Sequence, residues 1–204
     1  MRTLMTAQQT AFFTQNGYIE VEGLNFDPEE VFKVARTASN TQSFGRDLWR
    51  KEAFLSRLLL RKMTPAVTHL IAKPVRLACD QWIPAFSFDK ACPAKDLFCI
   101  QGLVLFAIFT AAEIPAPVRR AAALGIPPFS GRPSSVLFVK PHIVLDWPLL
   151  SKSPVELYLA AYALPNNAVY VHNLKDPATH SLKELGYEFG DILTESHHPI
   201  INIY

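Results

Sequence analysis

The chain has 204 residues, half of them hydrophobic, which is enough for one substantial core and predicts a single domain. Twenty Lys and Arg residues against eighteen Asp and Glu leave a formal net charge of only +2, so the composition gives no reason to expect a nucleic-acid partner. The longest apolar run, residues 97–112, is too short for a membrane-spanning helix, and the N-terminus lacks the apolar segment of a secretory signal. We therefore expect a cytoplasmic protein without a membrane anchor. Cys79, Cys92 and Cys99 show no paired spacing and are interpreted as reduced core thiols.

The first elements are predicted from short-range signals. Thr6, followed three residues later by Gln9, forms a capping-box pattern that begins a helix, and Gly17 ends it after residue 16. Large and charged side chains then alternate over residues 18–22, as they do in a half-buried strand.

A second helix is predicted to begin at Asp27, which can act as the N-cap before Pro28, and to run to about Ser39. Further helical segments are expected over residues 47–62 and 64–72. The basic side chains of this region are expected to form a solvated helix face: Arg46, Arg50, Lys51, Arg57, Arg61 and Lys62.

After Pro74 the sequence changes to short apolar runs separated by prolines, which is typical of a β-sandwich or barrel. The runs expected to form strands are 75–82, 97–112, 136–139, 143–147, 155–163, 168–172 and 199–204. The proline-rich segment 113–132 is interpreted as a loop with one short helical insert. We therefore predict one α+β domain over residues 1–204, with a mainly helical part, 1–73, packed against a mainly β core, 74–204.

Adjacent histidines, His197 and His198, lie close to the C-terminal end. Gly190 and Asp191 can turn the chain, residues 192–193 can start a strand, and the histidines then arrive where a strand of that length would end. Such a position suits a metal ligand. The alternative is a solvated turn ahead of the last strand, and the spacing alone favours this alternative.

The surrounding pattern resembles the second half of the phytanoyl-CoA-dioxygenase-like family. Asp-Pro-Ala-Thr-His at 176–180 is similar to the family's Pro-Gly-Ser-His turn, and Gly190-Asp191 and His197 follow in the family's order. Residues 4–24 resemble its opening helix, glycine and first strand. These proteins are non-haem iron and 2-oxoglutarate oxygenases. The resemblance therefore implies a double-stranded β-helix, or jelly roll, with N-terminal helices packed against it, and Fe(II) and 2-oxoglutarate as cofactors.

The resemblance also implies where the iron ligands would lie. The family uses a His-x-Asp pair on one strand, whose alternate residues share a face about 6.6 Å apart, and a distal histidine on another strand. Asp89 stands in the place of the acidic ligand, and His197 or His198 in that of the distal histidine. Ser87 replaces the histidine of the pair, and a serine is a poor Fe(II) ligand at neutral pH.

The one other candidate for the ligand pair is His142 with Asp146. These residues are spaced by four, which puts them about 13 Å apart in a strand, too far to chelate one ion. The cation that the family uses for the cosubstrate is also missing from its usual place. No arginine or lysine follows His198 to pair with the far carboxylate of 2-oxoglutarate. Lys140 or Arg132 would have to supply that charge from another strand.

Two classes of function follow. One is an active, divergent iron oxygenase with Asp89 and His197 or His198 on the metal. The other is a catalytically silent member of the fold whose pocket binds a small molecule or whose surface binds a protein. The simultaneous loss of an iron ligand and of the cosubstrate cation favours the second. A metal-responsive DNA-binding regulator ranks last, because the chain lacks a basic recognition helix and clustered ligand spacing.

Overall fold

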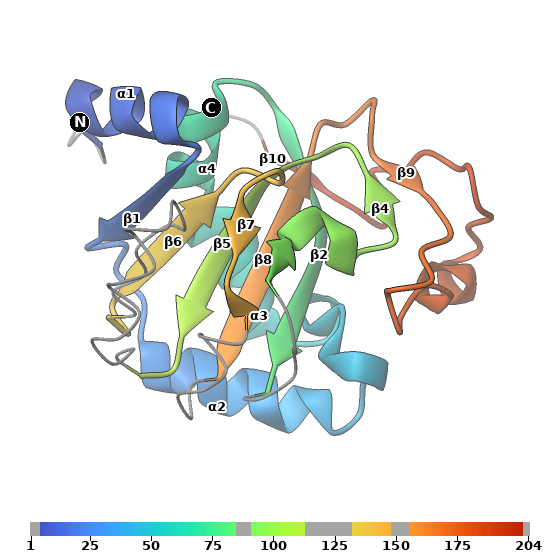
Figure 1. Cartoon of the computed structure of the whole chain (residues 1–204). Coiled ribbons are helices and arrows are strands. Elements are labelled where there is room, and N and C mark those ends of the chain that lie inside the picture. The colour runs from blue at the N-terminus through green and yellow to red at the C-terminus, as the bar shows by residue number, and fades with distance from the viewer. Residues whose placement is uncertain (1–4, 85–90, 113–131, 148–155, 202–204) are drawn as a thin grey trace.

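The structure, a computed structural model, describes residues 5–84, 91–112, 132–147 and 156–201 (Figure 1). An antiparallel six-stranded sheet lies at its centre, in the order β1-β6-β5-β8-β2-β10. Its strands are β1 (Tyr18–Glu22), β2 (Val75–Ile83), β5 (Leu103–Thr110), β6 (Ser135–Val139), β8 (Leu157–Ala163) and β10 (Ile200–Ile201). The central strand β8 is buried along its whole length. It is therefore apolar throughout and does not alternate.

Two short sheets lie against one face of the central sheet (Figure 1). One pairs β3 (Cys92–Pro93) with β7 (Val144–Leu145), and the other pairs β4 (Ile100–Gln101) with β9 (Val169–Tyr170). Because alternate strand residues point to opposite faces, Phe106 and Ile108 of β5 face these short sheets. There they join a buried apolar cluster with Trp147 and Tyr170, which fills the space between the layers.

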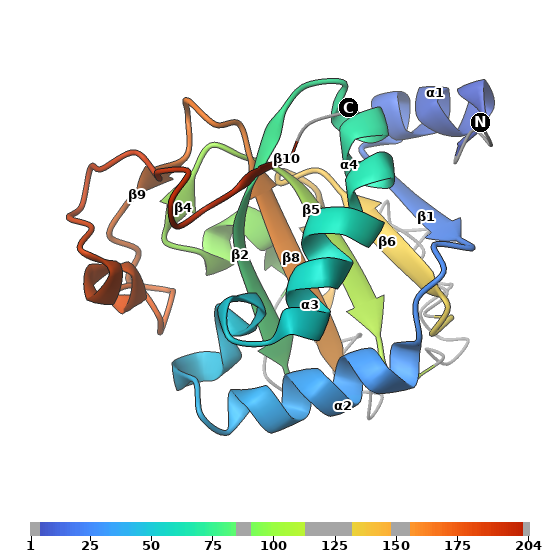
Figure 2. The same cartoon turned by 180° about the vertical axis from the view of Figure 1, so that it is seen from behind.

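Helices cover the opposite face of the central sheet (Figure 2). They are α1 (Ala7–Asn16), α2 (Pro28–Ser39), α3 (Ala53–Arg57), a π-helical turn η3 (Leu58–Lys62) and α4 (Thr64–Ile71), with the 3₁₀ turns η1 (Ser43–Gly45) and η2 (Leu48–Arg50) between them. Among the described residues, two further 3₁₀ turns, η4 (Ala94–Leu97) and η6 (Ser181–Leu185), contribute buried residues to the side of the short sheets. Phe109 and Tyr158 of the sheet pack against this helical layer. Among the described residues, no helix is long and apolar enough to cross a membrane.

The predicted beginnings of the first two helices are confirmed. Thr6 accepts a hydrogen bond from the Gln9 amide, and the Gln9 side chain accepts one from the Thr6 amide. Asp27 caps α2, with Pro28 in its first turn. These reciprocal bonds satisfy amide groups that a helix start leaves without intrahelical partners, which is why the local sequence was sufficient.

Two predictions for the β part are wrong in detail. The segment 97–112 is not one strand, because Gly102 separates β4 from β5. The histidines do not end a strand: Ile192 forms only a single bridge with Val169, and His197 and His198 lie in a turn that the His198 amide closes by donating to the Thr194 carbonyl at 2.9 Å. The turn leads directly into β10. Of the predicted loop 113–132, only its last residue lies within the described part of the chain.

The backbone at Gly102 requires glycine for two separate reasons. Its φ is +77°, and a Cβ built there would lie 1.9 Å from the Asn167 carbonyl oxygen, which belongs to the backbone and cannot rotate away. We expect Gly102→Ala to lower the free energy of unfolding by about 2 to 3 kcal/mol, measured by urea denaturation. Gly23→Ala is the matched control, since Gly23 has the same φ but open space around it. It should cost only about 1 kcal/mol, and equal losses in the two variants would contradict the close approach.

Candidate functional site

Two of the residues predicted to bind iron, His197 and His198, lie within the described part of the structure. Asp89 and Ser87 lie outside the described residues, so the role of Asp89 stays a prediction. His197 is half-buried and His198 is completely buried. Both imidazoles pack on the ring of Tyr187, with centroid distances of 5.8 and 5.7 Å. The solvated turn considered from the sequence is therefore wrong for His198.

Arginines from two elements converge on this turn. Arg50, at the end of η2, places its Nη2 atom 3.2 Å from both ring nitrogens of His198, while its Nη1 donates to the His197 carbonyl. Arg76 of β2, which pairs with Ile200 of β10, donates to the His198 carbonyl. The turn is thus held by two cations, and one of them faces the imidazole directly.

This surrounding keeps His198 neutral. Burial removes water from the charged form and lowers the pKa of His198 to about 3, and the charge of Arg50 acts in the same direction. A divalent ion on either ring nitrogen would lie about 2.1 Å from it and thus close to the guanidinium. At a separation of about 4 Å and an effective dielectric constant of 20, the repulsion between such an ion and Arg50 is about 8 kcal/mol. The immediate environment of His198 therefore does not fit a metal cation.

The other described residues considered for the metal and for 2-oxoglutarate lie beside β1 and β7. His142 is exposed before β7 and Asp146 is half-buried after it. Lys140 donates to the Thr14 carbonyl in α1 at 3.1 Å, and Arg132 pairs with Glu22 of β1 at 2.5 Å. Both cations proposed for the far carboxylate of 2-oxoglutarate are thus engaged at the β1 side of the fold. Within the described ranges, no three His, Cys, Asp or Glu side chains are grouped as a metal site requires.

A buried ion pair that the sequence did not reveal joins Arg46 to Asp176. Arg46 was expected on a solvated helix face, and that prediction is wrong: its side chain is 3% exposed and makes a two-pronged pair with Asp176, with Nη–Oδ distances of 3.0 and 3.2 Å. The Asp176 carboxylate also accepts from the amides of Cys99 and Ala178 at 2.7 and 2.9 Å. Arg46 further donates to Gln81 of β2. Asp176 begins the Asp-Pro-Ala-Thr-His segment. Through these bonds the segment connects the helical layer, the central sheet and the short sheets.

A second buried acid lies on the helical side of β2. Asp80 accepts hydrogen bonds from the Tyr158 hydroxyl and, at 3.0 Å, from the Trp49 amide. Burial, and to a smaller extent the neighbouring carboxyl of Asp47, raise the pKa of Asp80 to about 7. Arg50, which faces His198, also lies 3.7 Å from the Asp47 carboxylate. Asp47 and His198 therefore flank one arginine, and burial shifts their pKa values in opposite directions, raising that of Asp47 and lowering that of His198.

Comparison with known proteins identifies the fold. No protein-family model and no curated protein matches the chain. Among solved structures, it is similar to the non-heme alpha-ketoglutarate-dependent carbocyclase SnoK from nogalamycin biosynthesis, at 13% identity and a TM-score of 0.67 over 97% of both chains. The epimerase SnoN of the same biosynthesis gives 17% identity and a TM-score of 0.68 over 96% of this chain and 98% of SnoN. EctD from S. alaskensis, solved with bound Fe, gives 15% and 0.56 over 81% and 79%. The chain has the fold of non-heme, alpha-ketoglutarate (2-oxoglutarate)-dependent enzymes.

Proposed function

We propose that the protein is a catalytically silent member of this fold class, diverged from a phytanoyl-CoA-dioxygenase-like ancestor. It acts by binding a small molecule or a protein, and not as a conventional oxygenase. In this proposal the central sheet and the two short sheets form the two layers of a double-stranded β-helix. The protein works in the cytoplasm, where buried thiols such as Cys79 and Cys99 remain reduced.

The observation that carries the proposal is the position of Arg50. Its guanidinium faces the imidazole of His198, one of the two histidines that could take the place of the distal iron ligand, and binds the carbonyl of the other, His197. Positive charge there opposes Fe(II), and the same arginine helps to keep His198 in a neutral, buried state in which its lone pair can accept from Arg50.

The positions of the candidate cations for the cosubstrate support the same conclusion. A 2-oxoglutarate site needs a cation for the far carboxylate. Lys140 and Arg132, the two candidates from the sequence, contact Thr14 and Glu22 at the β1 edge of the central sheet, whereas the histidine turn leads into β10 at the opposite edge. In the active alternative, Fe(II) would be bound by Asp89 with His197 or His198, and 2-oxoglutarate would be the cosubstrate.

Calorimetric titration distinguishes the proposed silent binding protein from an active iron oxygenase. Mn(II), and Fe(II) under anaerobic conditions, would be added to the wild-type protein, to His197→Ala, to His198→Ala and to His142→Ala, each with and without 2-oxoglutarate. We expect no binding that depends on His197 or His198, so the four proteins should give the same heats. The active alternative requires the opposite: tight binding to wild type and His142→Ala, strengthened by 2-oxoglutarate and abolished in His197→Ala or in His198→Ala. That result would overturn the proposed function.

A further inference from the structure

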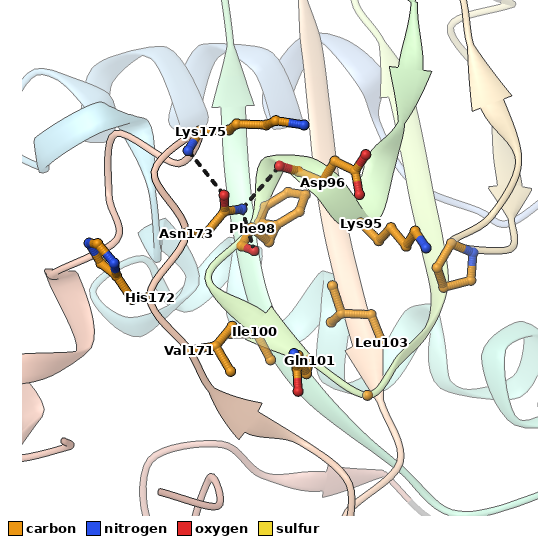
Figure 3. Close-up of a pocket in the computed structure, with 12 residues that line it drawn as sticks. Lys95, Asp96, Phe98, Ile100, Gln101, Leu103, Val171, His172, Asn173 and Lys175 are labelled. Carbon is orange, nitrogen blue, oxygen red and sulfur yellow. Dashed lines mark hydrogen bonds between the residues drawn. The ribbon is translucent and has the colours of Figure 1, made fainter. Parts of the chain in front are cut away.

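A pocket of about 570 Å³ opens between β4, η4 and the chain that follows β9 (Figure 3). Its volume lies in the range of small-molecule sites, about 300 to 1,000 Å³. The pocket is separate from the turn of His197 and His198, since neither histidine lines it. Its residues come from segments far apart in the sequence, so the fold itself forms the hollow.

The floor of the pocket is apolar and firmly supported. Phe98 and Ile100 are buried, and Leu103 and Val171 are half-buried beside them. The Phe98 ring stacks on Phe106 of β5, with centroids 5.6 Å apart. Its other support is the buried guanidinium of Arg46, 4.5 Å from the ring centroid. Such a floor provides a preformed surface for an apolar group and needs little rearrangement to bind one.

The polar edge of the pocket is fixed by Asn173 (Figure 3). Its amide group donates to the carbonyls of Asp96 and Phe98 at 3.0 and 2.9 Å, and its Oδ1 accepts from the Lys175 amide at 3.0 Å. The first two bonds tie the segment after β9 to η4 and to Phe98, which follows it, and the third bond lies within the segment itself. They hold the backbone of Lys175 and of Asp96, the neighbour of Lys95, at the same pocket.

The charges at this edge are unbalanced. Lys95 and Lys175 both line the pocket, and among the described residues no acidic side chain pairs with either ammonium group. Asp96 is the one acidic residue of the lining, against these two lysines. An apolar floor beside a net positive edge matches a molecule that carries an anionic group on an apolar body.

We propose that this pocket binds an organic carboxylate with an apolar body, its carboxylate beside Lys95 or Lys175 and its apolar part on Leu103 and Val171, over the buried Phe98 and Ile100. This inference rests on the proposed binding function and names the class of its ligand. Recognition is by charge at the edge and by buried apolar area at the floor, so both parts of the ligand are required.

Methyl NMR titration tests both requirements with three probes. 1-Naphthoate has the carboxylate and the apolar body, 1-naphthalenemethanol has the same body without charge, and 2-oxoglutarate has carboxylates without the body. We expect 1-naphthoate to bind about tenfold more tightly than either of the others and to shift the methyl signals of Leu103 and Val171.

Variants of the polar edge give the matched comparison. Lys95→Gln with Lys175→Gln should weaken 1-naphthoate about tenfold, to the level of the uncharged alcohol. Asp96→Asn should strengthen it, because it removes the one acidic group of the lining. Lys73→Gln, at an exposed lysine outside the pocket, should leave binding unchanged.

The proposal is overturned if 1-naphthoate binds no more tightly than the alcohol, if the double lysine variant binds it as wild type does, or if the shifted methyl groups lie elsewhere. Failure here and failure of the proposed function are distinguishable. Metal binding that depends on His197 or His198 contradicts the proposed function alone, whereas the absence of 1-naphthoate binding contradicts the pocket alone.

Discussion

Replacing Asp176 by alanine is expected to lower the free energy of unfolding by about 3 to 5 kcal/mol. The substitution leaves the guanidinium of Arg46, 3% exposed, without its counter-charge in the core. It also removes the acceptor of the Cys99 and Ala178 amides. A buried charge and two buried amide donors that lose their partners are more costly than the lost attraction itself. Urea denaturation at pH 7, with a common slope for both proteins, gives the difference.

Glu22→Ala is the control for that result. Glu22 pairs with Arg132 at 2.5 Å, but these side chains are 57% and 60% exposed. Water screens such a pair, so its loss should cost less than about 1 kcal/mol. The double variant Arg46→Met with Asp176→Leu should recover much of the loss of Asp176→Ala, since it leaves no uncompensated charge. A loss in Asp176→Ala as small as in Glu22→Ala would show that the buried pair does not stabilise the fold.

The second large effect concerns the pH dependence of stability. The pKa of His198 in the folded protein, about 3, lies below its usual value of about 6.5. Between these values the unfolded chain binds a proton that the folded chain does not, so His198 makes stability rise with pH. The pKa of Asp80, about 7, lies above its usual value of about 4. Between about pH 4 and 7 the folded chain keeps a proton that the unfolded chain loses, so Asp80 makes stability fall with pH.

The two contributions oppose each other between about pH 4 and 6.5, and single variants should reveal them. Relative to wild type, Asp80→Asn should gain a positive slope of stability against pH, and His198→Asn a negative one. The contribution to the free energy of unfolding that each substitution removes is on the order of 4 kcal/mol over the pH range between the folded and unfolded pKa values. Asp47, whose pKa is also raised by burial, is present in all three proteins, so the slope of each variant is compared with that of wild type. Denaturation at intervals from pH 4 to 7.5 provides the slopes, and unchanged slopes in both variants would contradict the shifts.

The sequence was informative where the deciding residues are close together. Thr6 with Gln9 and Asp27 with Pro28 determine helix starts within one turn, and both are found as predicted. Most of the strands were visible as short apolar runs for the same reason. The break at Gly102 was missed because an apolar run continues on both sides of it. The carbonyl that excludes a side chain at Gly102 is that of Asn167, in a distant segment.

The candidate site was harder to predict, since its decisive contacts are long-range. Arg46 and Asp176 are 130 residues apart, and no periodic pattern links them. The available signal was weak: one arginine among several basic residues and one aspartate before a proline. Similarly, His198 could be placed near the last strand, but the guanidinium that faces it comes from Arg50, 148 residues earlier. The sequence predicts residue types that bind metals, whereas the fold decides what charge lies beside them.

The order of the central sheet also determines when this chain can fold. The Ser135 hydroxyl of β6 donates to the Glu20 carboxylate of β1, a partner 115 residues earlier, and the central strand β8 joins β5 to the much earlier β2. Native topologies dominated by such distant contacts fold slowly, because a long segment must close before any of its pairings form. We expect the emerging chain to remain without its central sheet until β8 has left the ribosome, which makes the N-terminal helices a substrate for chaperones during synthesis.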